Sequence, residues 1–185
     1  MVVAFGDQAL AILREAIDEG VYAQFVFGDA AKRVRLVREI GGAKRGGMYG
    51  TVGVPALDSG ATAEWEQSFV AEYGRLPAFT YVKETYDPTI ALALAAQAAG
   101  SLHGPAIRDH LRIIASPPGQ VVLGTPSGVA DALRLLAEGR EVDYEGVATT
   151  LDWDEKGDLQ QGHIEVWRFT PDGDIETVET VFLQQ

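Results

Sequence analysis

Asp29 is the residue whose type and position could do the most chemistry in this sequence. It follows an apolar run, residues 22–27, that predicts a buried strand, and it precedes a predicted helix over about residues 31–40. In open α/β sheets, ligands bind just beyond the carboxyl ends of the strands. A carboxylate in that position can accept charge-assisted hydrogen bonds from an ammonium group. Asp is equally suited to capping the helix that follows, and the two roles are compatible.

Three aromatic residues are further candidates for a binding site. Phe5, followed by Gly6, ends the preceding apolar run and therefore occupies a position equivalent to that of Asp29. Tyr81 begins the longest predicted helix, and Tyr86 lies one to two turns further along. Buried tyrosines usually pack with the hydroxyl group hydrogen-bonded. An aromatic side chain at the start of a helix could instead line an apolar ligand pocket.

No recognised motif for nucleophilic or metal-dependent catalysis occurs in the chain. It lacks a G-x-S-x-G elbow, a P-loop and an H-E-x-x-H motif, and the absence of cysteine excludes a thiol nucleophile. Residues 152–158 (DWDEKGD) resemble the start of a calcium loop, but Lys156 and His163 stand where that loop needs oxygen ligands. We therefore predict a structural turn there, no metal and no cofactor. A hydrolase remains an alternative, and it would require His110 or His163 to lie within hydrogen-bond reach of a carboxylate.

The composition restricts the class of protein. The 185 residues include 15 basic and 27 acidic side chains, for a net charge of −12, and 46% of the residues are apolar. These values are typical of a folded domain, and the negative charge disfavours binding to nucleic acid. The basic cluster Lys32, Arg33, Arg35 and Arg38 has helical spacing, which predicts a solvated helix face.

The order of the predicted elements indicates an α/β fold made from parts of two lobes. The chain starts with strand, helix, strand and helix. The first strand ends at Gly6-Asp7, and the first helix runs from Asp7 to about Glu19. A third strand is expected at residues 48–54. Four helices then follow at about residues 62–73, 81–99, 105–114 and 129–137. The end of the chain predicts a hairpin of residues 163–169 and 175–182 around the turn at 171–174.

Neither a transmembrane span nor a signal peptide is predicted within these residues. A buried strand at the first residues would normally need a neighbouring strand. The sequence is therefore expected to begin in the middle of a larger fold.

Several stretches resemble one family when they are taken in order. The chain resembles the C-terminal half of type I periplasmic solute-binding proteins of the branched-chain amino acid (Leu/Ile/Val) ABC-transport class. The matching stretches are residues 13–20, 24–29 (QFVFGD), 86–89 (YDPT), 142–146 (VDYEG), 151–158 (LDWDEKGD) and 166–169 (VWRF). The stretch 142–146 resembles part of a late turn in that family.

The resemblance implies a Rossmann-like type I periplasmic-binding-protein fold that is incomplete. By analogy, residues 1–54 belong to the second lobe, residues 55–162 belong to the first lobe, and residues 163–185 form a hairpin that returns to the second lobe. The crossings would lie near residues 52–55 and 163–166. A protein of this family is about twice as long and binds its ligand in the cleft between the lobes.

Site residues also follow from the resemblance. Asp29 matches an acidic residue that holds the α-ammonium group of the ligand, and Tyr81 matches an aromatic residue of the side-chain pocket. Phe5 lies near a ligand-contacting aromatic residue of the second lobe. Asp29-Ala30 stands where some relatives have Glu-Gly, so Ala30 is included in the predicted site.

The implied function is the non-enzymatic substrate-binding component of an ABC importer. Such a protein is periplasmic or extracytoplasmic, binds an amino acid or a similar small carboxylate, and delivers it to a membrane permease. The alternative is a ligand-sensing regulatory domain on the same fold. The isolated chain is expected to bind ligand weakly or not at all. It is also expected to self-associate through an exposed sheet edge.

Overall fold

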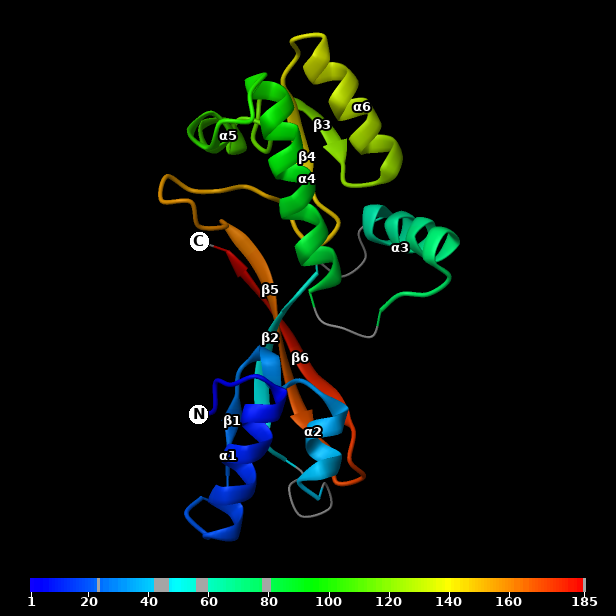
Figure 1. Ribbon diagram of the computed structural model, residues 1–185. Helices are drawn as coiled ribbons and strands as arrows, with labels where there is room; N and C mark the ends of the chain where they lie inside the picture. The colour runs from blue at the N-terminus through cyan, green and yellow to red at the C-terminus, as the bar shows by residue number, and fades with distance from the viewer. Residues whose placement is uncertain (23, 42–46, 56–59, 78–80, 185) are drawn as a thin grey trace. The chain divides into compact units, whose positions relative to one another are not determined.

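The structure of the protein is a computed structural model that describes residues 1–22, 24–41, 47–55, 60–77 and 81–184. The chain divides into two compact units (Figure 1). The first, which we call the N-terminal unit, contains Met1–Val54 and His163–Leu183. The second, which we call the central unit, contains Pro55–Gly162, together with Gln184. The assignment of these units to lobes stays a prediction.

The N-terminal unit is a four-stranded sheet with two α-helices and one short 3₁₀ helix. The strands β1 (Val26–Phe27), β2 (Tyr49–Val54), β5 (Gln161–Phe169) and β6 (Ile175–Gln184) lie in the order β1-β2-β5-β6. β1 is parallel to β2, whereas β2 is antiparallel to β5. The helices are α1 (Gly6–Asp18), η1 (Asp29–Ala31) and α2 (Val34–Glu39).

Aromatic side chains build the core of the N-terminal unit. The ring centroids of Phe27 and Trp167 lie 5.9 Å apart, and Phe169 lies 5.3 Å from Phe27 and 5.2 Å from Trp167. Leu13 of α1 and Val37 of α2 are completely buried. Burial of this apolar surface is the main term that stabilises the unit.

The central unit combines a small parallel sheet with four helices. Its strands are β3 (Gln120–Leu123) and β4 (Val142–Glu145), and its helices are α3 (Gly60–Tyr73), α4 (Val82–Ala99), α5 (Gly104–Leu111) and α6 (Pro126–Ala137). Leu94 of α4, Leu135 of α6 and Tyr144 of β4 belong to one buried cluster. Thr125 caps α6, since its Oγ1 accepts a hydrogen bond from the Gly128 N–H at 3.2 Å.

Most of the predicted helices are confirmed, but several boundaries and strands were wrong. The expected first strand is only one parallel bridge, between Val2 and Phe27. The expected strand at 22–27 is shorter and contains only Val26–Phe27. The expected helix at 31–40 is split into η1 and α2. Asp7 does not cap α1, because Phe5 occupies the N-cap position and Asp7 lies in the first turn.

The two strands of the central unit were not predicted. Residues 142–145, which the family motif placed in a turn, form β4 instead. The three side chains of Val142, Asp143 and Tyr144 are all buried. The final hairpin is confirmed, because Thr170 and Asp174 close the turn between β5 and β6 with a 2.9 Å backbone hydrogen bond.

Among the helices of the described ranges, none has on its own the length and hydropathy needed to cross a membrane. Only α4 and α5 taken together, with a bend of 107° between them, pass that test by length and composition.

One edge of β3 has no neighbouring strand in the part of the chain that the structure describes. Two apolar side chains of this strand are exposed, Val121 at 59% and Leu123 at 42%. An unpaired apolar edge can pair with another chain. We therefore expect the isolated chain to self-associate.

The substitution Val121→Lys tests this expectation. A charged side chain on an edge strand opposes pairing, so the variant is expected to shift the isolated chain toward monomer in light scattering. Leu102→Lys introduces the same charge at a residue that is 89% exposed and lies outside the strands, and it should leave the size distribution unchanged. A wild-type chain that stays monomeric at every concentration would contradict the prediction.

Candidate functional site

Three parallel segments of the N-terminal sheet point the same way, so their carboxyl ends lie at the same end of the sheet. Val2 forms a parallel bridge with Phe27 of β1, and β1 is parallel to β2. Phe5 follows the first segment and Asp29 follows the second, so the structure brings these two predicted site residues to the same end of the sheet. We call Phe5, Gly6, Asp29, Ala30 and Arg33 the strand-end rim.

Asp29 is exposed and begins η1. Its Oδ1 accepts a hydrogen bond from the N–H of Ala30 at 2.7 Å, while Gly28 occupies the N-cap position of this short helix. The carboxylate therefore helps to fix the turn after β1. The prediction that Asp29 caps a helix was wrong, because Arg33 occupies the N-cap position of α2. Its predicted contact with a ligand ammonium group stays a prediction.

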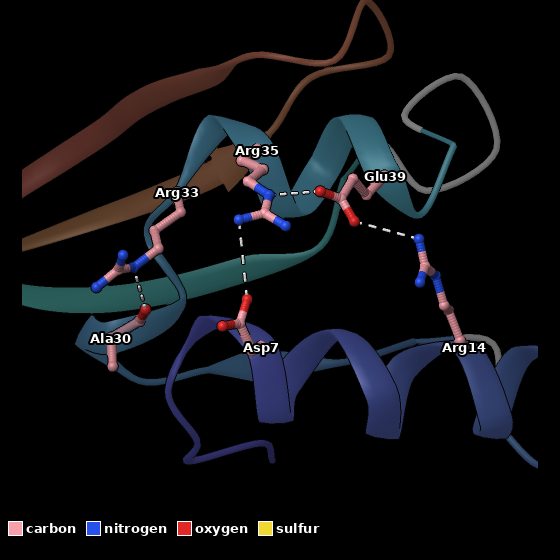
Figure 2. Close-up of polar contacts among 6 residues, drawn as sticks. All are labelled: Asp7, Arg14, Ala30, Arg33, Arg35 and Glu39. Atoms are coloured by element: carbon pink, nitrogen blue, oxygen red, sulfur yellow. Dashed lines mark hydrogen bonds and ion pairs between the residues drawn. The ribbon is translucent and has the colours of Figure 1, made fainter.

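Arg33 connects the two halves of the strand-end rim. Its Nε donates to the carbonyl oxygen of Ala30 at 3.2 Å, which Figure 2 shows as a dashed line. Its side chain also lies over Gly6, where an added Cβ would be 3.2 Å from the Arg33 Cδ. Phe5, next to Gly6, is 72% exposed. The rim therefore presents an aromatic ring, a carboxylate and a guanidinium group.

Tyr81 belongs to the central unit, at the N-cap position of α4. Its φ of 70° is the one positive φ of a non-glycine residue within the described ranges. This left-handed conformation costs an L-residue about 1–2 kcal/mol, and such strain is often found at functional positions. The Tyr81 carbonyl accepts hydrogen bonds from the N–H and the hydroxyl of Thr85. Its predicted role in a ligand pocket stays a prediction.

Tyr86 packs in the central unit, as the structural interpretation predicted. Its ring centroid lies 5.3 Å from that of Trp65, and burial raises the pKa of the Tyr86 hydroxyl. The residue that follows, Asp87, holds a larger network that the sequence did not reveal. Asp87 is 1% exposed although it carries a carboxylate.

Three donors from the β4 strand and the loop after it converge on the Asp87 carboxylate. Oδ1 accepts from the Tyr144 hydroxyl at 3.0 Å and from the Val147 N–H at 2.9 Å, and Oδ2 accepts from the Ala148 N–H at 2.7 Å. Burial raises the pKa of Asp87, and these hydrogen bonds oppose that rise. At Gly146, an added Cβ would lie 2.4 Å from Asp87 Oδ2. Asp87 therefore fastens α4 to the segment after β4.

The basic cluster at residues 32–38 is not a uniformly solvated face. Arg35 fits that prediction, since its side chain is 74% exposed. The Lys32 side chain is only 21% exposed, and its Nζ lies 2.5 Å from Oε2 of the buried Glu165. Thr177 donates to the other oxygen of Glu165 at 2.8 Å. This ion pair links the η1–α2 connection to β5.

The histidines and the acidic turn have structural contacts. His110 Nδ1 lies 2.8 Å from the Ala106 carbonyl oxygen of its own helix, and the ring of His163 lies 5.0 Å from that of Phe182. Within the described residues, neither imidazole is hydrogen-bonded to a carboxylate, and no group of acidic or histidine side chains could hold a metal ion. Asp154 accepts from the N–H groups of Lys156 and Asp158, which closes the predicted turn and lowers its pKa.

The chain is therefore a two-unit α/β protein whose N-terminal unit is completed by the last strands of the sequence. Two solved structures define the fold more closely. One is a leucine-binding protein, LivK, from Thermotoga maritima, with a TM-score of 0.62 and 19% identity over 97% of this chain and 43% of that chain. The other is the branched-chain amino acid transporter substrate-binding protein LivJ from Streptococcus pneumoniae, solved with isoleucine. It has a TM-score of 0.60 and 16% identity over 100% of this chain and 44% of that chain.

This likeness shows that the chain has part of the type I periplasmic-binding-protein fold, as the sequence motifs predicted. The chain spans less than half the length of these two proteins. No protein-family model and no curated protein sequence matches the chain.

Proposed function

We propose that the protein carrying this sequence is the substrate-binding component of an ABC importer for branched-chain or related amino acids. The observation that carries the proposal is the fold, which matches two amino-acid-binding proteins over nearly the whole chain. The exposed Asp29 carboxylate at the end of a parallel strand gives further support, because this is where α/β folds bind ligands.

In the proposed complex, Asp29 accepts hydrogen bonds from the α-ammonium group of the amino acid. Phe5, Ala30 and Tyr81 contact the rest of the ligand, which is held between the two lobes of the complete protein. The protein works outside the cytoplasm, carries out no reaction, needs no cofactor and passes the amino acid to a membrane permease.

The substitution Asp29→Ala tests this proposal in the complete natural polypeptide that carries these residues. Removal of one charge-assisted hydrogen-bond acceptor is expected to weaken amino-acid binding about 10- to 100-fold, measured by isothermal titration calorimetry with leucine. Asp7→Ala is the matched control. Its side chain is 88% exposed in the first turn of α1 and pairs with Arg35 at 3.9 Å.

The control should bind leucine as the wild-type protein does. Equal affinities for the wild-type protein and Asp29→Ala would remove Asp29 from the binding site. A wild-type protein that binds no amino acid would overturn the proposed function itself.

A further inference from the structure

Arg33 carries a positive charge that no carboxylate offsets within the described residues. Its one hydrogen bond there is from Nε to the Ala30 carbonyl oxygen, at 3.2 Å. This contact engages neither of the two terminal nitrogens, Nη1 and Nη2. Arg33 also lies just before α2, in an extended conformation with φ −139° and ψ 122°, so its side chain is set apart from the helix that follows.

Three of the neighbouring cations, Arg14, Lys32 and Arg35, have an acidic partner, whereas Arg38 donates to the Gly173 carbonyl oxygen at 3.2 Å. Figure 2 shows Glu39 between Arg35, at 2.5 Å, and Arg14, at 3.2 Å, and Asp7 beside Arg35. Lys32 is paired with Glu165. Among the cations of this cluster, Arg33 and Arg38 have no acidic partner within the described residues, and of the two only Arg33 belongs to the strand-end rim.

Arg33 lies next to the carboxylate that we propose as the ammonium ligand. Ala30 connects the two charges, because its N–H donates to Asp29 and its carbonyl oxygen accepts from Arg33. Figure 2 shows Arg33 directed toward Ala30, away from the Glu39 network. A negative and a positive group thus flank a single residue on the strand-end rim, a pattern that complements a ligand with both an ammonium and a carboxylate group.

We propose that Arg33 is a specificity-determining residue that binds a carboxylate of the ligand. The planar guanidinium group can donate two parallel hydrogen bonds to one carboxylate, and its charge persists at any physiological pH. The carboxylate is either the α-carboxylate of an amino acid or that of an acidic side chain. The inference rests on the proposed amino-acid-binding function and deepens it.

Calorimetry on the complete natural polypeptide tests Arg33 with three probes. Leucine has only an α-carboxylate, glutamate has a second carboxylate, and leucinamide has none. Arg33→Gln is expected to weaken binding of a contacted carboxylate about 10- to 100-fold and to change leucinamide binding less than about 3-fold. A loss for both leucine and glutamate assigns Arg33 to the α-carboxylate, whereas a loss for glutamate alone assigns it to the side chain.

Two further variants sharpen the test. Arg35→Gln removes the same charge two residues away and should change binding of every probe by less than about 3-fold, since Arg35 faces Glu39 and Asp7. Arg33→Lys keeps the charge without the planar fork. It should therefore weaken binding of the contacted carboxylate by a smaller factor than Arg33→Gln, and it serves as the readout if Arg33→Gln does not fold.

The outcomes separate this inference from the proposed function. Unchanged binding of leucine and glutamate in both Arg33 variants would overturn the inference, and so would an equal loss for leucinamide, which would indicate that Arg33 only positions Ala30. If Asp29→Ala weakens all three probes while the Arg33 variants do not, the proposed function stands and the inference fails. A wild-type protein that binds none of the probes overturns both.

Discussion

Replacing Asp87 with Ala is expected to lower the free energy of unfolding of the central unit by about 3–5 kcal/mol. The substitution leaves three buried donors without an acceptor: the Tyr144 hydroxyl and the N–H groups of Val147 and Ala148. An unsatisfied buried donor costs about 1–3 kcal/mol. Three such donors cost at least about 3 kcal/mol, and the expected loss is set near that lower bound because neighbouring groups relax; it still places Asp87→Ala among the most destabilising single substitutions.

Amide hydrogen exchange and urea unfolding measure this effect. The N–H groups of Val147 and Ala148 should exchange faster in Asp87→Ala, because they lose the acceptor that protects them. Asp87→Asn keeps the shape and one carbonyl oxygen, so its loss should be smaller. Asp109→Ala is the control, since that side chain is 60% exposed on α5 and an exposed substitution changes stability by about 0.5 kcal/mol or less. Equal stabilities for Asp87→Ala and the control would refute the role of Asp87.

Gly50→Ala is expected to destabilise the N-terminal unit by about 3 kcal/mol, the upper end for overpacking a core. Gly50 of β2 lies opposite Trp167 of β5 in the sheet register. A Cβ at position 50 would lie 2.2 Å from Trp167 Cζ2 and within 2.7 Å of two more ring atoms. Trp167 is completely buried against Phe27 and Phe169, so the ring has no free space to enter.

The same strand provides a matched control for Gly50→Ala. At Gly53, also in β2, an added Cβ meets no atom within 4 Å, so Gly53→Ala should leave the urea midpoint nearly unchanged. In a Trp167→Leu background, Gly50→Ala should cost less, because the smaller side chain leaves room for the methyl group. Equal destabilisation by the two glycine substitutions would show that strand conformation, rather than the contact with Trp167, sets the cost.

The elements that the sequence predicted well carry their own local signals. Helix α1 has an apolar face and ends near Gly20, whereas helix α4 is rich in alanine and ends at Gly100. Both glycines have a positive φ. The position of Asp29 at a strand end also followed from local pattern alone. β3 and β4 were missed because each has only four residues, too few to show a period. Both strands depend on packing against α6 and against α4, which is distant in the sequence.

The roles of Asp87 and Arg33 were not predicted from the sequence. The partners of Asp87 are distant in the chain, and the direction of the Arg33 side chain does not follow from the helical spacing around it. The donors that Asp87 accepts from lie 57 to 61 residues later, so no spacing within a helix could reveal them. Arg33 lies in a run whose spacing is typical of a helix face, yet α2 begins only at Val34. The extended backbone at Arg33 turns its side chain toward the strand-end rim, which periodicity does not encode.

The antiparallel pairing of Val54 with His163 has a consequence for synthesis on the ribosome. These two residues lie opposite each other in one sheet, yet the whole of Pro55–Gly162 is translated between them. Domains fold as they emerge, so most of the central unit can fold before residues 164–169 of β5 are made. Until Trp167 and Phe169 leave the ribosome, Phe27 lacks the rings that cover it. Residues 1–54 are thus translated before the central unit but reach their final packing after it, and a pause in translation before β5 would leave that aromatic surface exposed to chaperones.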